Sequence, residues 1–405
     1  MTETIRFVFV SNYLNHHQIP FCDAMYERLQ GSFVFLQTEE VEQERIAMGW
    51  NAENEKPYLR MFQEDPERSR QLILDAEVVL FGGTDDETYI EKRLEEKKPV
   101  VRYSERLYKE GQWKCVSPRG LMKKYHDHTR HGKDPVILLC SGAYVPSDFS
   151  IVRAYPNKMY VWGYFPETKT YDIKALMEKK AANAVPKILW AARMIDWKHP
   201  ELPIKVAAEL RGRGLKFHLD VVGGGEMMPV VEELVKQYEL QEYVTLHGFK
   251  KPAEVRELME QSNIYLMTSD RGEGWGAVVN EAMNSGCAVV GNHMVGAVPY
   301  LLEHEKCGMI YRDKEDQALF DIVARLVEDK AFTRQLGETA YGRITGLWNA
   351  ENAADRLLKL CLKLGFLQPQ SCEVTEGDAA WSEGPCSPAK VIGERKMFSY
   401  LMKKN

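Results

Sequence analysis

The sequence contains no apolar stretch near the roughly 18 residues that a membrane-spanning helix requires. It contains no CxxC pair either, and the spacing of its eight cysteines fits neither a zinc site nor a disulfide framework. Positive charge is not in excess, since the formal net charge is −6, so nothing global indicates a nucleic-acid partner. The first residues lead into a strand pattern without a signal-peptide pattern. We therefore expect a cytoplasmic protein that binds no nucleic acid.

One nucleotide-binding signature is also missing. The first strand pattern is not followed by GxGxxG, the turn that holds the pyrophosphate of a dinucleotide. A dinucleotide-dependent oxidoreductase is therefore disfavoured.

The sequence has instead the pattern of an α/β protein with two domains. Its 405 residues exceed what one hydrophobic core usually holds, and short β-rich runs alternate with longer helical periods, as in parallel sheets. In the first half, strands are expected at Ile5–Val10, Phe33–Gln37, Val78–Phe81, Pro99–Tyr103 and Val136–Cys140. In the second half, they are expected at Lys187–Ala191, Lys216–Val222, Val244–Leu246, Asn263–Met267, Ala288–Gly291 and Met309–Tyr311.

The domain boundary is expected where an extended run ends at Trp162 and a polar stretch begins. We assign residues 1–165 to an N-terminal domain and 166–368 to a C-terminal domain. Residues 369–388 have little periodicity and are expected to be a flexible linker. The helical pattern of 389–403 is expected to pack on the first domain. Because parallel sheets bind ligands at the carboxyl ends of their strands, functional residues should lie in the loops after strands.

Two glutamates follow the predicted strand Asn263–Met267. Glu273 lies in a glycine-rich loop and Glu281 lies eight residues later, inside the next predicted helix. Carboxylates accept strong hydrogen bonds from hydroxyl groups, so the pair is suited to hold a sugar and a ribose. Alternatively, Glu273 is an ordinary acid at a helix N-terminus and Glu281 a solvated helix residue.

The second half, over roughly 186–345, resembles the group 1 (family 4) glycosyltransferases. Six segments occur in the family's order, namely 191–198, 221–226, 244–249, 273–281, 295–300 and 307–311. The resemblance implies the GT-B architecture, in which two Rossmann-like domains face a central cleft. It also implies that the N-terminal domain binds the acceptor and the C-terminal domain binds a nucleotide-sugar.

The resemblance implies roles for several residues of these segments. Arg193 and Lys198 would bind the donor diphosphate and stabilise its growing charge, Glu273 would bind the transferred sugar and Glu281 the ribose. Further donor contacts would come from Gly223, Gly224, Phe249, Lys250, Gly274, Trp275, Gly276 and Ala277. The alternatives are a surface salt bridge for Arg193, a solvated amine for Lys198 and an ordinary strand-to-helix turn for the two glycines at 223 and 224.

The candidates for acceptor binding lie in two loops of the first half. They are Asn15, His16, His17, Ser104 and Glu105. Either histidine could bind a phosphate or a sugar hydroxyl, or could cap the helix that Pro20 begins. Many family members carry a histidine where this chain has 101–106, and Glu105 could instead pair with Arg102 or Arg106.

A basic stretch runs from Arg119 to Lys133 with only one acid, Asp127. It could attract an anionic membrane surface or a lipid-linked phosphate acceptor, or be a solvated face.

The sequence therefore predicts a retaining glycosyltransferase that transfers a sugar, by default from a UDP-sugar, to a glycan, lipid-linked or other hydroxyl acceptor. We expect no cofactor and no metal, because no predicted strand ends in the Asp-x-Asp of metal-dependent transferases. Peripheral association with the inner membrane face is one interpretation of the basic stretch, and a solvated face is the other. The alternatives are a nucleotide-sugar epimerase of the same fold and a non-catalytic sugar-nucleotide-binding protein.

Overall fold

The computed structural model describes residues 5–41, 56–372 and 381–403. The chain forms two compact units, each containing two segments of the sequence. Unit 1 comprises Met1–Glu167 and Leu347–Ile392, and unit 2 comprises Thr168–Gly346 and Gly393–Asn405. The division after Glu167 lies close to the boundary expected from the sequence.

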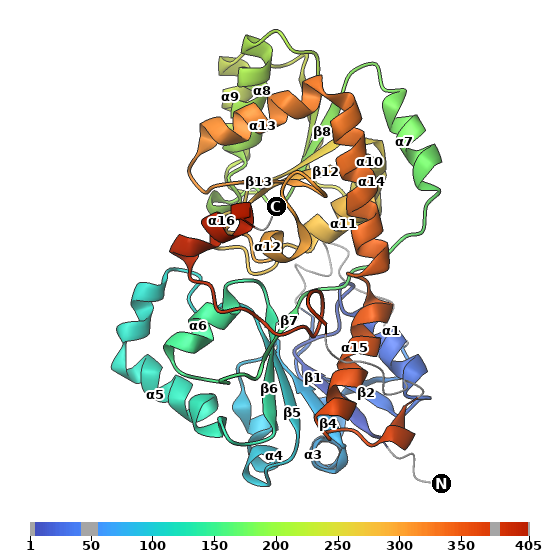
Figure 1. Cartoon of the computed structure of the whole chain (residues 1–405), viewed down its shortest axis with the longest axis vertical. Helices are drawn as coiled ribbons and strands as arrows, with labels where there is room; N and C mark the ends of the chain where they lie inside the picture. Colours follow the sequence, from blue (N-terminus) through green and yellow to red (C-terminus); the bar gives the residue numbers. More distant parts are fainter. Residues whose placement is uncertain (1–4, 42–55, 373–380, 404–405) are drawn as a thin grey trace. The chain divides into compact units, whose positions relative to one another are not determined.

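Unit 1 is built around a parallel sheet with the strand order β3-β2-β1-β4-β5-β6-β7 (Figure 1). Its strands are β1 Phe7–Ser11, β2 Phe33–Gln37, β3 Leu59–Met61, β4 Val78–Phe81, β5 Val100–Ser104, β6 Val136–Ser141 and β7 Met159–Trp162. The central strand β1 is buried along its whole length, as expected for a parallel sheet covered on both faces.

Helices and short 3₁₀ turns connect the strands of unit 1. The helices are α1 Ile19–Arg28, α3 Pro66–Asp75, α4 Glu91–Glu95, α5 Pro118–Asp127, α6 Val145–Ile151 and α15 Ala350–Lys363. The 3₁₀ turns are η1 Phe62–Glu64, η2 Glu87–Tyr89, η3 Gln112–Val116, η4 Thr129–His131 and η6 Pro369–Ser371. Two of these helices, α3 and α5, begin with a capping side chain followed by proline; the Asp65 carboxylate, for example, accepts a hydrogen bond from the Arg68 N–H at 3.0 Å.

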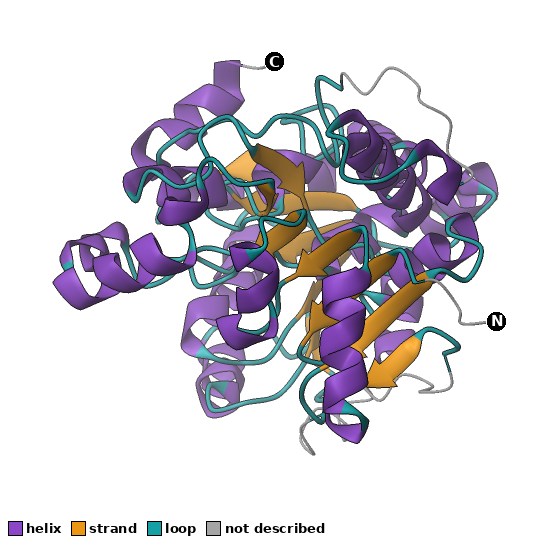
Figure 2. Ribbon diagram, turned by 90° about the horizontal axis from the view of Figure 1, so that it is seen from below, coloured by secondary structure: helices purple, strands orange, loops and turns teal. Residues whose placement is uncertain are grey.

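Unit 2 repeats this design with the strand order β10-β9-β8-β11-β12-β13. Its strands are β8 Lys187–Ala191, β9 His218–Val222, β10 Val244–Leu246, β11 Ile264–Met267, β12 Ala288–Asn292 and β13 Met309–Tyr311. Its helices are α7 Ile173–Ala181, α8 Glu201–Gly212, α9 Met228–Gln237, α10 Pro252–Gln261, α11 Val278–Asn284, α12 Val298–Leu301, α13 Asp316–Glu328, α14 Lys330–Gly346 and α16 Glu394–Lys403, with the 3₁₀ turn η5 Asp196–Lys198. Figure 2 shows strands lying side by side with helices around them. The hydrophobic core of unit 2 contains buried side chains from its strands and from its helices.

Two strands of unit 1 were not among those expected from the sequence. β3 has only three residues, Leu59–Met61, at the edge of the sheet, which is too short a run to stand out in the sequence. β7 is the end of the extended run that the sequence shows before Gly163.

The C-terminal part of the chain divides differently from the expected 166–368 and 389–403. Helix α15 belongs to unit 1, where Arg28 of α1 pairs with Glu351 at 2.6 Å and with Asp355. Helix α16 belongs to unit 2 rather than to the first domain, and its Phe398 ring packs on His293 at 5.4 Å between ring centroids.

The expected linker 369–388 is also more ordered than predicted where the structure describes it. Residues 373–380 lie outside the described residues. After them, the chain runs antiparallel beside β7, because the Cys386 N–H donates to the Val161 carbonyl and the Val161 N–H donates to the Ser387 carbonyl, each at 2.8 Å. Both Cys386 and Ser387 are buried, so this part of the segment is part of the fold.

Candidate functional site

The loops that follow β8 and β11 in unit 2 are joined by a short chain of hydrogen bonds. The Trp190 indole N–H donates to the Thr268 hydroxyl at 2.7 Å, and this hydroxyl donates to the Lys198 carbonyl at 2.7 Å. The Asp270 N–H also donates to the Trp197 carbonyl at 3.0 Å. These bonds hold the loop with Lys198 against the loop with Glu273, at the carboxyl ends of neighbouring strands.

Lys198 and Glu273 form an ion pair at this edge of the sheet. The Lys198 ammonium donates a hydrogen bond to the Glu273 carboxylate, and the two side chains are only 14% and 12% exposed. The ammonium also lies over the Trp197 ring, 4.3 Å from its centroid, which favours a cation. Two of the three predicted catalytic side chains are therefore in direct contact.

A third ionisable residue, His199, joins the same two loops and was not predicted. Its ring pairs with Asp270 at 3.4 Å and with Glu201 at 3.2 Å. Hydrogen bonds to Asp270 and then to Glu201 outweigh its partial burial and raise the pKa of His199 to about 10. His199 is therefore protonated at neutral pH. Glu201 is close to His199 in the sequence, but Asp270 lies in a loop far along the chain, so the sequence alone does not show that both acids meet at this ring.

Glu281 lies on the first turn of α11 and is half-buried. Burial raises the pKa of the Tyr265 hydroxyl well above its usual value, and the charges of Glu281 and Glu273 raise it further. Glu273 lies in the loop after β11 and Glu281 lies in the helix that follows this loop, so both residues come after the carboxyl end of β11. The structure thus brings the two glutamates to one edge of the sheet.

Arg193, the third predicted catalytic residue, is exposed in the loop after β8, and a glycine supports the backbone beside it. Gly223 has a φ of +137°, and a Cβ added there would lie 1.8 Å from the Ala192 carbonyl oxygen. The Gly224 carbonyl accepts a hydrogen bond from the Met194 N–H at 2.8 Å. The turn at 223–224 therefore packs against the Arg193 loop, which agrees with its interpretation as a structural turn; a contact with the nucleotide stays a prediction.

The predicted contacts at Gly274, Trp275, Gly276 and Ala277 rest on their backbone. The Trp275 side chain is buried in the unit, where its indole N–H donates to the Asn280 side chain at 2.9 Å. Gly276 has a φ of +92° and is crowded by Met267 and Val295, so a side chain would not fit. The tryptophan thus anchors the loop in the core and cannot stack on a ligand.

The two residues predicted to contact the base follow β10. Phe249 is an exposed aromatic ring. Lys250 donates to Glu254 at 3.1 Å. Their loop adjoins the glycine turn, because the Gly223 N–H donates to the Gly248 carbonyl at 2.9 Å.

In unit 1, the predicted residues His16 and His17 follow β1. The His17 N–H donates to the Asn15 side chain at 3.0 Å, which fixes the turn. Burial lowers the pKa of His16 to about 4 and that of His17 well below its usual value, the charge of His16 adding to the second effect. Both rings are therefore neutral at pH 7 and suited to accept or donate a single hydrogen bond.

Tyr164 contacts both Glu105 and His17. The Tyr164 hydroxyl donates to Glu105 at 2.7 Å, and the Tyr164 ring stacks against His17 at 6.3 Å between centroids. The carboxylate also pairs with Lys109 at 2.5 Å. The Ser104 hydroxyl donates to the Glu105 carbonyl at 2.8 Å.

The two arginines near Glu105 in the sequence pair with other acids. Arg102 pairs with Glu87 at 2.6 Å, and Arg106 pairs with Asp148 at 3.3 Å in a fully buried ion pair. Each arginine is thus held by a carboxylate from another element.

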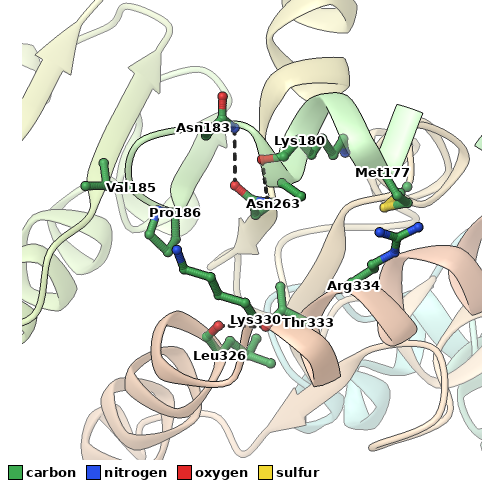
Figure 3. A pocket seen from close by; sticks show the side chains of 12 residues that line it. Met177, Lys180, Asn183, Val185, Pro186, Asn263, Leu326, Lys330, Thr333 and Arg334 are labelled. Carbon is green, nitrogen blue, oxygen red and sulfur yellow. Dashed lines mark hydrogen bonds between the residues drawn. The ribbon is translucent and has the colours of Figure 1, made fainter. Parts of the chain in front are cut away.

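A pocket of about 80 Å³ in unit 2 lies at the opposite edge of the sheet (Figure 3). Pro186 and Asn263, which line it, immediately precede β8 and β11, so it opens at the amino ends of these strands. Figure 3 shows Lys330 and Thr333 facing Asn183 across the pocket. No predicted donor-binding residue lines it, so it is not the candidate site.

Two kinds of feature are absent from the described residues. No group of three or more His, Cys, Asp or Glu side chains is placed to hold a metal ion. No described helix combines the length and the apolar character that crossing a membrane requires.

The second unit matches a known family in sequence. Residues 172–343 match the family described as Glycosyl transferases group 1. The chain is 29% identical over 154 residues to the colanic acid biosynthesis glycosyltransferase WcaL of Salmonella typhimurium, covering 37% of each chain. It is 26% identical to the amylovoran biosynthesis glycosyltransferase AmsK of Erwinia amylovora, covering 49% of each chain. The match to alpha-D-kanosaminyltransferase of Streptomyces kanamyceticus is also 26% identical and covers 47% of this chain and 49% of that one. The matched region therefore spans about a third to a half of the length of these curated relatives.

The fold is shared with solved structures along most of the chain. Alr3699/HepE from Anabaena, solved in complex with UDP, is 14% identical with a TM-score of 0.67, over 88% of this chain and 100% of that one. Sucrose-phosphate synthase from Thermosynechococcus elongatus is 14% identical with a TM-score of 0.60, over 89% and 99%. This likeness establishes the expected GT-B fold class, with two Rossmann-like α/β domains. The family match covers the part of unit 2 that contains Lys198, Glu273 and Glu281. Residues 172–343 are therefore a domain of the group 1 glycosyltransferase family.

Proposed function

We propose that this protein is a retaining, metal-independent glycosyltransferase. It transfers a sugar from a nucleotide-sugar, with UDP-sugars as first candidates, to a glycan, lipid-linked or other hydroxyl acceptor. The observation that carries this proposal is the ion pair of Lys198 and Glu273 at the carboxyl ends of β8 and β11, inside the region that matches the family.

Donor binding begins with an exchange of partners at Lys198. The diphosphate is a stronger anion than one carboxylate, so it displaces Glu273 from the ammonium and is also bound by the exposed Arg193. The released Glu273 carboxylate accepts hydrogen bonds from the hydroxyls of the sugar. Glu281, at the same edge of the sheet, binds the ribose hydroxyls in the same way.

The reaction then needs stabilisation of the leaving diphosphate. As the bond between the anomeric carbon and the diphosphate oxygen breaks, its electron pair goes to the diphosphate. Arg193 and Lys198 stabilise this charge as fixed cations, the part that a divalent metal plays in other transferases. The acceptor oxygen attacks from the face that the diphosphate leaves, and its proton goes to a diphosphate oxygen, so the anomeric configuration is retained.

The relatives support a transferase that builds a glycan. Two of them are named for the biosynthesis of the polysaccharides colanic acid and amylovoran, and a structural neighbour was solved with UDP. An epimerase or a non-catalytic binding protein is not favoured, because the curated relatives are named as glycosyltransferases and the four predicted donor side chains are all present. For a glycan or lipid-linked acceptor, we propose that the enzyme works at the inner face of the membrane.

The test is thermal unfolding of the purified protein with a panel of nucleoside diphosphates and their sugars, with and without EDTA. Ligand at about a hundredfold excess over Kd should stabilise the fold by about 2.7 kcal/mol. We expect stabilisation by one nucleotide family and no effect of EDTA. Transfer to an acceptor should then fall by at least about a hundredfold in Lys198→Ala and Glu273→Ala.

Lys236→Ala is the matched control, since it removes an exposed lysine on α9 in the same unit. It should leave both stabilisation and transfer unchanged. Unchanged transfer in Lys198→Ala would refute the site, and stabilisation that disappears with EDTA would refute metal independence.

A further inference from the structure

Most of the exposed large apolar side chains described in unit 1 lie in one short segment, formed by η3 and α5. Among the described residues, nine large hydrophobic side chains are exposed, and five of them lie between positions 113 and 125. They are Trp113, Val116, Leu121, Met122 and Tyr125. The other four are scattered singly, which is normal for a protein surface, whereas a cluster of this kind marks a site of interaction.

Helix α5 has its apolar face outward. Leu121, Met122 and Tyr125 have the spacing of one helical face, and all three are exposed, Met122 to 74%. The opposite face, with Lys124 half-buried and Asp127 buried, lies against the unit. A surface helix of a globular protein normally has the reverse arrangement, with its apolar stripe toward the core.

The helix is held firmly in this orientation. At its start, the Ser117 hydroxyl accepts a hydrogen bond from the Gly120 N–H at 3.3 Å. After its end, the ring of His128 is hydrogen-bonded to the Tyr155 hydroxyl at 2.8 Å, and the Thr129 hydroxyl donates to the Val152 carbonyl at 2.8 Å. The outward apolar face is therefore a fixed property of the fold.

The charge of the segment identifies what would cover this face. Between positions 112 and 127 the sequence has four cations, Lys114, Arg119, Lys123 and Lys124, and one acid, Asp127, although the chain as a whole carries −6. Lys123 pairs with Asp127 and Lys114 pairs with Glu110, and the surface keeps a net positive charge. Apolar and aromatic side chains flanked by cations match a bilayer surface, where acyl chains meet anionic headgroups. Tryptophan and tyrosine are also the side chains enriched at this depth.

We propose that the segment Gln112–Asp127 is a docking surface for a bilayer of anionic phospholipids. Leu121, Met122 and Trp113 enter the boundary between headgroups and acyl chains, and the cations contact the phosphates. Each cation near such a surface strengthens binding by about fivefold. Figure 1 shows α5 at the outer edge of unit 1. The proposal does not rest on the proposed activity, since the donor residues belong to unit 2.

The test is sedimentation of the full chain with vesicles of phosphatidylglycerol mixed with phosphatidylcholine, and with vesicles of phosphatidylcholine alone. We expect binding to the anionic vesicles that falls at least about tenfold without the anionic lipid and falls similarly at high salt. The double variant Leu121→Ser/Met122→Ser should lose at least about tenfold in binding. Val230→Ser, which removes an exposed apolar side chain in unit 2, should bind like the wild type.

The double variant should keep the wild-type melting temperature, because both side chains are exposed, and should keep any stabilisation by nucleotides. Absence of binding to anionic vesicles, or equal binding by the double variant, would overturn the proposal. So would sedimentation of the wild type alone as a dimer that the double variant dissociates, because a second copy of the chain would then cover the face.

Discussion

Replacing Glu273 by glutamine should have opposite effects on nucleotide binding and on sugar transfer. In the structure the Lys198 ammonium is already neutralised by Glu273, and a diphosphate must displace this carboxylate before it can pair with the lysine. Glutamine has nearly the same shape and can still accept a hydrogen bond, but it carries no charge. In Glu273→Gln the diphosphate therefore meets a lysine without a competing anion.

The size of the effect follows from the burial of the pair. Exposed ion pairs contribute about 0–1 kcal/mol, and breaking a fully buried pair costs about 3–5 kcal/mol. The Lys198 and Glu273 side chains are 14% and 12% exposed, so their pair lies between these two cases. We therefore expect the competition between Glu273 and the diphosphate for Lys198 to weaken diphosphate binding by about 1–2 kcal/mol. The Kd for the free nucleoside diphosphate should therefore fall about five- to thirtyfold in Glu273→Gln. Transfer should still decrease, because the amide holds the sugar hydroxyls less strongly than a carboxylate.

Isothermal titration calorimetry with UDP, or with whichever nucleoside diphosphate stabilises the wild type, measures the first effect directly. Glu281→Gln provides the comparison, because Glu281 is proposed to bind the ribose and its loss should weaken nucleotide binding. If UDP binds Glu273→Gln no more tightly than the wild type, the idea that Glu273 and the diphosphate compete for Lys198 is refuted.

Two further predictions concern the loops that carry the site. Gly223→Ala should lower the free energy of unfolding by about 3 kcal/mol in chemical denaturation, because its Cβ would meet the Ala192 carbonyl and φ is +137°. Gly224→Ala has no atom within 4 Å of the new Cβ and should change stability little; equal losses in the two variants would contradict this. The ion pairs of His199, whose side chain is 30% exposed, should contribute about 1–3 kcal/mol of stability. This contribution is fully present below the ordinary pKa of 6.5 and is lost as the pH rises through about 10. The stability difference between wild type and His199→Asn should therefore shrink from pH 6 to pH 10, and a constant difference would show that protonation of His199 is not involved.

The strands were predictable because the parallel sheets bury them completely. Runs such as Ile264–Met267 are apolar at every position and bounded by polar residues, which leaves little choice of position. β3 could not be found in this way, because an edge strand of three partly exposed residues has no period to detect. The assignment of α15 and α16 failed for a different reason, since an amphipathic helix does not encode which of two similar domains covers its apolar face.

The sequence predicted those site residues that lie in the six ordered segments. The order of six segments pointed to Lys198 and Glu273, and the structure places their side chains in contact. Glu105 shows that closeness in the sequence does not identify ion-pair partners. Arg102 and Arg106 are suitable partners by position, but both pair with acids from other elements. The charge of the segment at 119–133 was visible in the sequence, whereas the outward apolar face of α5 was not. An apolar stripe at helical spacing normally indicates a buried face, and only the fold shows that this one is exposed.

The two ion pairs between the loops after β8 and β11 have different consequences for a ligand. Both cations come from adjacent positions, Lys198 and His199, and both acids, Glu273 and Asp270, come from the loop after β11. A diphosphate that takes Lys198 from Glu273 breaks one of these links. The other link remains, because His199 is held by Glu201 as well as by Asp270 and because the Trp190–Thr268–Lys198 hydrogen bonds involve no charge. The loops can therefore exchange one partner for the donor without separating, which is what a site that must bind and release a diphosphate in every turnover requires.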